Sequence, residues 1–242
     1  WGSALHLIDG EEFTIKAGDA FVISPGRLHQ YTELNQLVLA NILFDAKALG
    51  VEDWDIKSLP GFHAFFCLEP AFRSKHGFRS RLQLSKAKLL EVRNFITLLR
   101  EEMDAAQPGY KIAVTGLFMH LAVILSRCYS DTPNEESLDL LRIGNALAHI
   151  ESNYHQHIDV DGLAKISHLS RRHFMRTFRE CMGTTPMNHL MHVRVNRAAE
   201  MLVKTDKTIT EIAFDCGFSD SNYFSRCFRK VLDKTPRQHR EG

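Results

Sequence analysis

The sequence predicts an α+β protein with two domains, a β-rich N-terminal domain and an all-helical C-terminal domain. Short alternating patterns interrupted by turn residues fill residues 5–45, as in antiparallel strands. From Ser85 onwards, the apolar residues recur at helical spacing instead. A polar stretch that contains proline, residues 130–138, divides the helical part and is typical of a linker. A chain of 242 residues is long enough for both domains.

The strands of the N-terminal part are predicted from its turn residues. A hairpin is expected over residues 6–11, because the Asp-Gly pair near its centre favours the tight turns of hairpins. Another strand is expected at residues 20–23, between two turns that contain glycine. The apolar run at residues 37–44 is typical of a buried strand. Residues 46–80 are rich in aromatic side chains and irregular in pattern, so no regular element is predicted there.

Two long helices are predicted next. Ser85 is expected to cap the first helix, whose apolar side chains recur every three to four residues. Pro108 and Gly109 are expected to end that helix, because neither residue continues a helix well. Residues 111–129 are predicted to form a second helix that is apolar on most faces. Together these elements give a helix pair over residues 85–129.

Composition narrows the class of protein. No apolar run approaches the roughly 20 residues that a membrane span needs, and the start of the chain has no pattern of a secretory signal. The chain begins at Trp1 with no methionine, so native residues upstream are expected to be missing. Its five cysteines are an odd number without metal-ligand spacing, which favours reduced thiols over disulfides or a zinc site. These observations predict a cytoplasmic protein.

The charge is unevenly distributed although the net charge is only +1. Residues 1–138 hold 14 Lys/Arg against 17 Asp/Glu, whereas residues 139–242 hold 16 Lys/Arg against 12 Asp/Glu. A basic surplus in one domain is what a phosphate-binding surface requires. The excess of four charges supports binding to nucleic acid but does not establish it.

An internal repeat at an offset of 50 residues runs through the C-terminal part. The matching residues are Phe174, Arg176, Phe178, Arg179, Thr185, Pro186 and His189, which recur as Phe224, Arg226, Phe228, Arg229, Thr235, Pro236 and His239. Each copy begins with a short helix pattern, at residues 160–166 and 209–215, followed by a tight turn and a second helix. Ser170 and Asp220 are expected to cap the second helices. This order is the helix-turn-helix plan, present twice.

The second helix of each copy is expected to have an apolar inner face and a polar outer face. Phe174 and Phe178 are four residues apart, as are Phe224 and Phe228, so each pair lines one face and packs inward. On the outer face, Arg can bind guanine, Asn can bind adenine and Met can touch a thymine methyl group. A helix over residues 187–202 would join the copies, so that two recognition helices about 34 Å apart enter successive major grooves. The alternative, amphipathic helices with merely solvated arginines, is disfavoured by the matched duplication.

The segment from Ile209 to Lys230, together with Thr235, Pro236 and Arg240, resembles the signature of the AraC/XylS family of bacterial transcription regulators. The resemblance covers residues 139–242 and implies a seven-helix, double helix-turn-helix DNA-binding domain. By position, it implies base contacts from Arg172, Met175, Arg176, Ser221, Asn222, Ser225 and Arg226. One departure is Asp233, which stands where the first copy has Gly183. A slightly strained helix end is expected there, because Asp tolerates the left-handed conformation less well than Gly.

Residues 18–29 resemble the second motif of cupin barrels, with Gly18, Gly26 and His29 at the expected spacing. The resemblance implies a cupin-like, ligand-sensing β-barrel over residues 1–84, truncated at its N-terminus. Aromatic and polar side chains that could line a small effector pocket are Phe21, His29, Tyr31, Asn41 and Trp54. In an enzymatic cupin, His29 would bind a metal beside a His-x-His pair, but no such pair precedes it. We therefore expect a hydrogen-bonded histidine, no metal and no cofactor.

Two further resemblances concern regulation. Residues 59–84 resemble regulators near the rhamnose-responsive branch of the family, and residues 85–129 resemble the dimerisation helices of sugar-responsive members. They imply a homodimeric regulator that binds promoter DNA and a small effector such as a sugar, and that contacts RNA polymerase if it is an activator. Two alternatives remain, a metal-dependent cupin enzyme and a regulator without small-molecule input. The enzyme is disfavoured, since a duplicated basic helix-turn-helix domain would serve no purpose in it.

Overall fold

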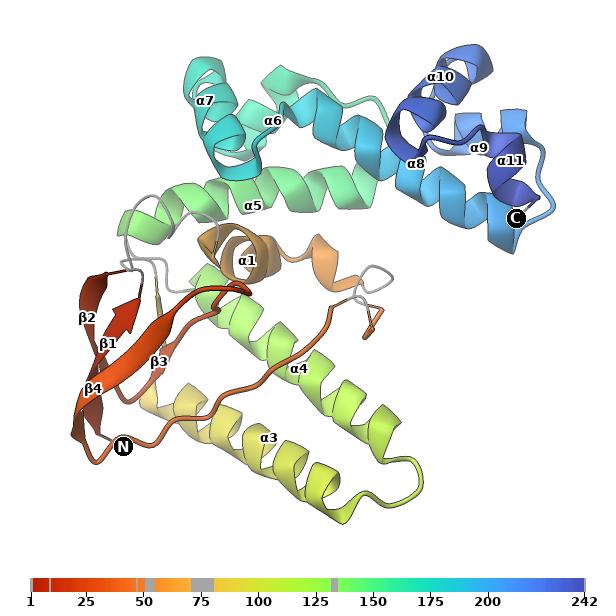
Figure 1. The fold of residues 1–242 in the computed structure, drawn as a ribbon. Coiled ribbons are helices and arrows are strands. Elements are labelled where there is room, and N and C mark those ends of the chain that lie inside the picture. Colours follow the sequence, from red (N-terminus) through yellow and green to blue (C-terminus); the bar gives the residue numbers. More distant parts are fainter. Residues whose placement is uncertain are drawn as a thin grey trace. The chain divides into compact units, whose positions relative to one another are not determined.

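The computed structural model describes residues 2–8, 10–46, 48–50, 55–70, 81–131 and 135–241. The chain forms two compact units, Trp1–Gly144 and Asn145–Gly242, which are described separately below. The first unit combines strands and helices, and the second is made of helices (Figure 1). The all-helical C-terminal part expected from the sequence is therefore confirmed.

Strand β1 (Ser3–Ile8) is the centre of a three-stranded antiparallel sheet with the order β2-β1-β4. Strand β2 (Glu11–Lys16) pairs with β1 so that Ile8 lies opposite Glu11, which confirms the hairpin predicted over residues 6–11. Strand β4 (His29–Asn35) pairs with the other edge of β1. The side chains of β1 alternate between buried and half-buried, because successive residues of a strand point to opposite faces.

A second, two-stranded sheet is formed by β3 (Asp19–Ala20) and β5 (Leu82–Gln83). The strand predicted at residues 20–23 is therefore reduced to its first residue. Within the described residues, the strands make these two sheets and do not close into a barrel. The cupin-like barrel is thus not confirmed by this structure.

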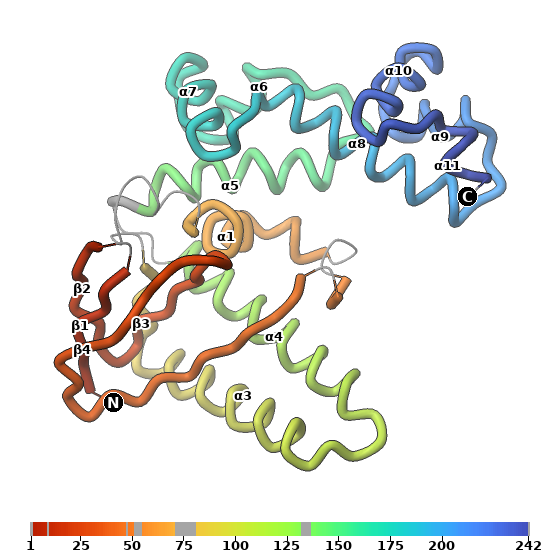
Figure 2. The backbone as a smooth tube through the Cα atoms, viewed as in Figure 1, coloured from red at the N-terminus to blue at the C-terminus, as the bar shows by residue number. Residues whose placement is uncertain are grey.

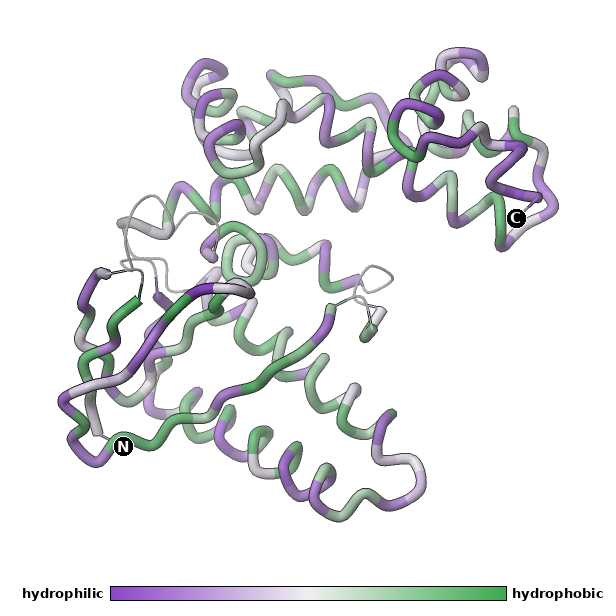
Figure 3. The backbone as a smooth tube through the Cα atoms, viewed as in Figure 1, coloured by the Kyte–Doolittle hydropathy of each residue, from purple (hydrophilic) through white to green (hydrophobic). Residues whose placement is uncertain are grey.

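The strand predicted at residues 37–44 is wrong. This segment has no regular structure, and its apolar side chains are largely exposed, with Val38 at 71% and Leu43 at 85%. Figure 3 colours it almost continuously as hydrophobic. An apolar run becomes a strand only if its backbone pairs with a neighbouring strand, and the described part of the chain offers none here.

A helical segment follows where an irregular one was predicted. Residues Asp55–Ser58 form a 3-10 turn (η2), and α1 (Pro60–Phe62) continues into a π-helical stretch, η3 (His63–Leu68). Pro60 begins α1, as is common for proline at the first helical position. The segment packs on the helix that contains Ser126, since a Cβ at Gly61 would collide with the Ser126 carbonyl oxygen. Small and aromatic residues alternate in this segment without a clear helical spacing, so the sequence pattern did not predict the helix.

Helices α3 (Lys86–Ala105) and α4 (Tyr110–Asp131) are the predicted pair, and they pack along each other. Ser85 caps α3 as expected, with its Oγ accepting a hydrogen bond from Lys88 N at 3.3 Å. The Phe95 and His120 rings stack between the two helices at 4.6 Å. By length and composition alone, α4 could cross a membrane, but the core helix of a soluble protein passes the same test.

Helix α5 (Glu135–Asn153) begins in the first unit and ends in the second. The elements after it are α6 (Val160–Ile166), α7 (Arg171–Met182), α8 (Pro186–Lys204), α9 (Ile209–Asp215), α10 (Ser221–Leu232) and α11 (Pro236–Arg240). Helices α6 and α9 are both 7 residues long, and α7 and α10 are both 12 residues long, so the sequence repeat is also a structural repeat (Figure 2). Of the predicted linker at 130–138, residues 130–131 belong to α4, 135–138 belong to α5, and 132–134 lie outside the described residues.

Candidate nucleic-acid interface

Each recognition helix starts at the capping residue predicted from the sequence. Ser170 accepts a hydrogen bond from His173 N at 3.3 Å and begins α7. Asp220 accepts from Asn222 N at 2.8 Å and from Tyr223 N at 3.2 Å, and begins α10. Both caps satisfy amide groups that a helix start leaves without a partner. The caps therefore fix where the outer face of each helix begins.

The phenylalanine pairs lie inward in both copies. The rings of Phe174 and Phe178 are 5.6 Å apart, those of Phe224 and Phe228 are 5.5 Å apart, and all four side chains are fully buried. Aromatic rings in such edge-to-face pairs contribute more than their buried area alone. Because the inner face is fixed this firmly, the residues on the opposite face must point to solvent.

On α7, the predicted base-reading residues lie on the outer face. Arg172 and Arg176 are exposed, and Met175 is half-buried. Arg176 is 4.0 Å from Glu180 one turn later, a surface pair that is too weak to hold the guanidinium in place. Arg171 instead donates to Asp161 of α6 at 2.7 Å and links the two helices of the first copy.

On α10, Asn222 and Arg226 are exposed, whereas Ser221 and Ser225 are half-buried. The Ser225 hydroxyl donates to the Ser221 carbonyl oxygen at 2.9 Å. The guanidinium of Arg226 lies 5.8 Å from the ring centre of Tyr223, which is itself half exposed. Sequence analysis did not single out Tyr223, although an aromatic residue on the polar face of a recognition helix is a signal that could have identified it.

Helix α10 ends as predicted at Asp233, which adopts the left-handed conformation with φ 56°. Its amide donates to the Arg229 carbonyl oxygen at 2.9 Å, as the Gly183 amide does to Arg179 at 2.8 Å in the first copy. The second copy therefore keeps the helix end despite losing the glycine. The cost is a modest backbone strain at a residue type that tolerates this region better than most.

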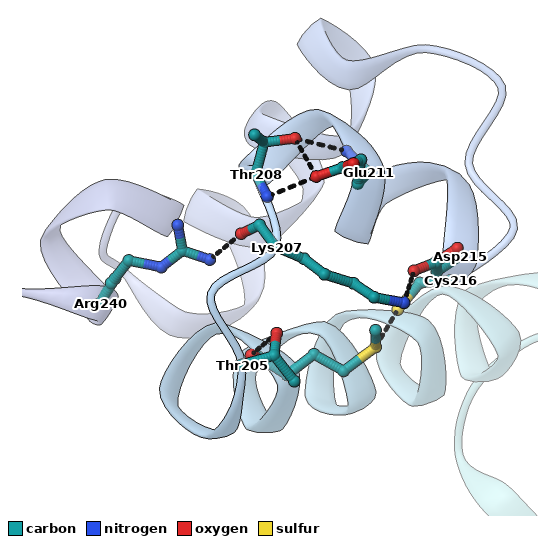
Figure 4. A network of polar contacts seen from close by, with 8 residues as sticks. Thr205, Lys207, Thr208, Glu211, Asp215, Cys216 and Arg240 are labelled. Carbon is teal, nitrogen blue, oxygen red and sulfur yellow. Dashed lines mark hydrogen bonds and ion pairs between the residues drawn. The ribbon is translucent and has the colours of Figure 1, made fainter.

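Arg240, one of the arginines that make the C-terminal part basic, has a structural role. Arg240 of α11 donates from Nε to the Leu202 carbonyl oxygen at 3.2 Å. Its Nη2 donates to the Lys207 carbonyl oxygen at 2.5 Å (Figure 4). It thereby fastens the loop between α8 and α9. Arg240 belongs to the sequence signature that resembles the family. Its guanidinium binds main-chain carbonyl oxygens within the domain, so it is not a candidate for contact with bases.

The same loop starts α9 through a capping box (Figure 4). Thr208 Oγ accepts from Glu211 N at 3.2 Å, and the Glu211 carboxylate accepts from Thr208 N at 2.7 Å. The hydrogen bonds that the carboxylate accepts from the Thr208 amide and hydroxyl groups lower the pKa of Glu211. Lys207 Nζ pairs with Asp215 at 2.8 Å across the length of α9. The first helix of the second copy is thus held at both ends.

Comparison with known proteins places these features in a family. A model described as a helix-turn-helix domain matches residues 163–242. The HTH-type transcriptional activator RhaS of Escherichia fergusonii is 31% identical over 242 residues, which cover 100% of this chain and 82% of that protein. The RhaS of Klebsiella pneumoniae is 29% identical with the same coverage. The chain belongs to the AraC/XylS family, near its RhaS branch.

This AraC/XylS regulator is similar also to a solved structure, the AraC-type DNA-binding regulator of Chromobacterium violaceum. The two share 33% identity over 41% of this chain and 89% of that chain, with a TM-score of 0.40. The family assignment rests on the relatives that match the full length. It establishes the chain as a DNA-binding transcription regulator.

A second candidate site of the regulator lies in the first unit, around His6 of β1. The fully buried His6 ring stacks against Phe21 at 5.2 Å and against Tyr31 at 4.7 Å. His29 meets the same ring edge-on at 5.7 Å. The strand register places His6 opposite Tyr31 and Ile8 opposite His29, so β4 delivers two of these rings to β1.

Three of the five predicted effector residues, Phe21, His29 and Tyr31, are therefore close together. Asn41 is exposed in the irregular segment after β4, and Trp54 lies outside the described residues. Sequence analysis missed His6, although the alternation of β1 places it on the same face as two buried apolar residues. Among the described residues, no group of three His, Cys, Asp or Glu side chains is arranged to hold a metal ion.

Proposed function

We propose that this regulator reads its operator with the outer faces of α7 and α10, which enter successive major grooves. The observation that supports this is the matched geometry of the two copies, in which buried Phe pairs leave Arg176 and Arg226 exposed at equivalent positions. Residues that would contact bases are Arg172, Met175, Arg176, Ser221, Asn222, Ser225 and Arg226. Tyr223 and the cap at Asp220 position the start of α10 for this contact.

Selection from a pool of random duplex DNA with the purified chain tests this proposal. We expect enrichment of sequences with two conserved blocks about 10 base pairs apart, because two such helices lie about one helical turn apart. A chain that carries Arg176→Ala and Arg226→Ala together should enrich no such sequence. Enrichment of a single block, or equal recovery by the double variant, would contradict reading by both helices.

We further propose that the regulator activates transcription in the cytoplasm and contacts RNA polymerase, since its relatives are transcriptional activators. The same relatives support the expectation that the chain is not an enzyme. A homodimer through the helix pair is proposed because α3 exposes Leu90, Leu98 and Met103. Sedimentation of the chain and of Leu90→Glu tests it, and a monomer at micromolar concentration would exclude the dimer.

A small effector such as a sugar is proposed to bind beside the group of rings around His6, which consists of His6, Phe21, His29 and Tyr31. Sugars bind to aromatic faces that carry a few polar partners, and Phe21, Tyr31 and His29 provide both. The test is a thermal-shift screen with monosaccharides on wild-type protein, Tyr31→Ala and the matched control Phe214→Ala, whose ring is exposed in the other unit. We expect a shift that Tyr31→Ala removes and Phe214→Ala keeps. The absence of any shift would favour a regulator without small-molecule input.

A further inference from the structure

The turn between α9 and α10 is covered by the segment that joins α5 to α6, just before the first copy. A Cβ at Gly217, where φ is +83°, would lie 2.7 Å from the His155 carbonyl oxygen. The equivalent turn of the first copy has His168 at this position, with φ 52° and an exposed side chain. The two turns have matching hydrogen bonds, Gly217 N to Phe214 O at 2.9 Å and His168 N to Lys165 O at 3.0 Å. Glycine is therefore required by the close approach of the covering segment and not by the turn alone.

Arg194 of α8 holds the covering segment in place. Its Nε donates to the Tyr154 carbonyl oxygen at 2.7 Å, and its Nη2 donates to the Gln156 carbonyl oxygen at 2.8 Å. The guanidinium also lies 5.8 Å from the ring centre of Phe218, in the turn before α10. A planar guanidinium can make all three contacts at once, whereas the ammonium group of lysine cannot. One side chain thus joins the end of α5 to the turn of the second copy.

Two other contacts strengthen this junction. The Tyr154 side chain packs against the core of the second copy, which includes Phe218, Phe224 and Phe228. Arg197, one turn after Arg194 on α8, lies 3.5 Å from Glu151 of α5, and both side chains are mostly buried. Tyr154, directly after α5, therefore contacts the second copy, and the end of α5 contacts α8. These residues lead into α6, and α6 packs on α7, so the contact links the first copy to the second in addition to α8.

We propose that Arg194 is a positioning residue that fixes the spacing and rotation of α7 relative to α10. A helix such as α8 can bend, and with only α8 between them the copies could adapt to half-sites at different spacings. The contacts of Arg194 with Tyr154, Gln156 and Phe218 remove that freedom. The regulator consequently selects its operator by the distance between the two half-sites as well as by their sequences. This inference rests on the proposal that both helices read DNA.

The experiment uses the full chain and the two-block duplex that it enriches from random DNA. Affinity is measured by fluorescence anisotropy for that duplex, for versions with one base pair added or removed between the blocks, and for each block alone. One added base pair rotates a half-site by about 34° and moves it by about 3.4 Å. We expect wild-type binding to weaken about tenfold, the loss typical of one misplaced base contact. The DNA affinity of Arg194→Ala should fall less than about threefold when the spacing changes by one base pair. Its affinity for each single block should equal that of the wild type.

Matched variants separate positioning from folding. Asn196→Ala on the exposed side of α8 and His168→Ala in the equivalent turn should keep wild-type spacing selectivity. Gly217→Ala should lose it as Arg194→Ala does, because its Cβ displaces the covering segment. Arg194→Lys keeps the charge but loses the forked contact, and it carries the test if circular dichroism shows that Arg194→Ala does not fold.

Each remaining outcome decides the question. If Arg194→Ala and Arg194→Lys keep the tenfold discrimination between spacings, α8 alone sets the spacing and the inference is wrong. An equal loss of affinity for single blocks and for all spacings would mean that Arg194 only stabilises the fold. A wild-type chain that enriches no two-block sequence would overturn the proposed mode of DNA reading, and this inference with it.

Discussion

Phe228 of α10 lies edge-on to His239 of α11, with ring centroids 5.5 Å apart. The same contact occurs 50 residues earlier between Phe178 of α7 and His189 of α8, at 6.0 Å. Each recognition helix is therefore held against the helix that follows it by an identical pair of residue types. Because the repeat extends to these ring contacts, positions on α7 and α10 can be compared one to one.

This equivalence predicts opposite effects for the two faces of a recognition helix. Phe178→Ala and Phe228→Ala should each lower the free energy of unfolding by roughly 3–5 kcal/mol, because each removes a fully buried ring and leaves a cavity. Arg176→Ala and Arg226→Ala should change it by less than about 0.5 kcal/mol, since both side chains are exposed. Urea denaturation followed by circular dichroism measures all four. A larger loss for the Arg variants than for the Phe variants would mean that the faces are assigned the wrong way round.

Binding to DNA should weaken steeply with salt. Lysine and arginine contacts to phosphates release condensed counterions, so the logarithm of the affinity falls linearly with the logarithm of the salt concentration. Arg194 and Arg240 already bind main-chain carbonyl oxygens, so they should not contribute to this slope. Lys230→Ala, on the exposed side of α10, should reduce the slope by about one. For proteins that contact several phosphates, the DNA affinity falls by orders of magnitude between about 50 and about 200 mM salt. An affinity that stays constant over this range would contradict phosphate binding.

The buried carboxyl group of Asp19 is expected to make the stability of the protein depend on pH. Its side chain is almost inaccessible and accepts a hydrogen bond from Lys16 N at 2.8 Å, with Arg81 Nε 3.5 Å away. Burial raises the pKa of Asp19 more than these partners lower it. The native state therefore holds the proton more tightly than the unfolded chain, and this stabilising contribution is lost as pH rises through the native pKa.

The variant Asp19→Asn should accordingly gain stability relative to wild type as pH rises from about 4 to about 7. Denaturation curves of both proteins across that range give the difference directly. Glu11→Gln, at an exposed carboxyl group of β2, is the matched control for the loss of one carboxylate. If the difference between wild type and Asp19→Asn decreases as pH rises, partner charges outweigh burial at this site.

Local signals were sufficient to predict the second unit. The caps Ser170 and Asp220, the Phe spacing and the left-handed end at Asp233 all depend on neighbouring residues within one or two helical turns. The same held for Ser85 and α3 in the first unit. Such elements are predictable because their geometry is decided by the sequence around them.

Features decided by distant residues were not predictable. Whether residues 37–44 form a strand depends on a pairing partner, and the apolar pattern carries no information about one. Arg194 and Arg240 counted as surface charge in the sequence, yet their carbonyl partners lie 33 to 40 residues away along the chain. His6 became a candidate site residue only when the strand register placed it beside Tyr31.

The final prediction concerns base recognition by Arg176 and Arg226. Each lies two residues before the second buried Phe of its helix, on the opposite face, and neither is held by a buried partner. Loss of a bidentate arginine contact should cost about 1–3 kcal/mol and relax the preference at a single base pair. The positions relaxed by Arg176→Ala and Arg226→Ala should be about 10 base pairs apart, because the proposed mode of binding places the two helices in successive major grooves.

Binding of each variant to a set of single-base changes in the selected operator measures this prediction. The control Lys230→Ala should weaken binding to every sequence alike, because a contact to phosphate carries no base preference. The two outcomes differ in kind, since a base reader changes the ranking of sequences and a phosphate contact does not. Arg226 also has Tyr223 beside its guanidinium, so Tyr223→Ala should relax the same base pair as Arg226→Ala, by a smaller amount. Uniform weakening by Arg176→Ala and Arg226→Ala would place both guanidinium groups on phosphates and remove them from the set of base-reading residues.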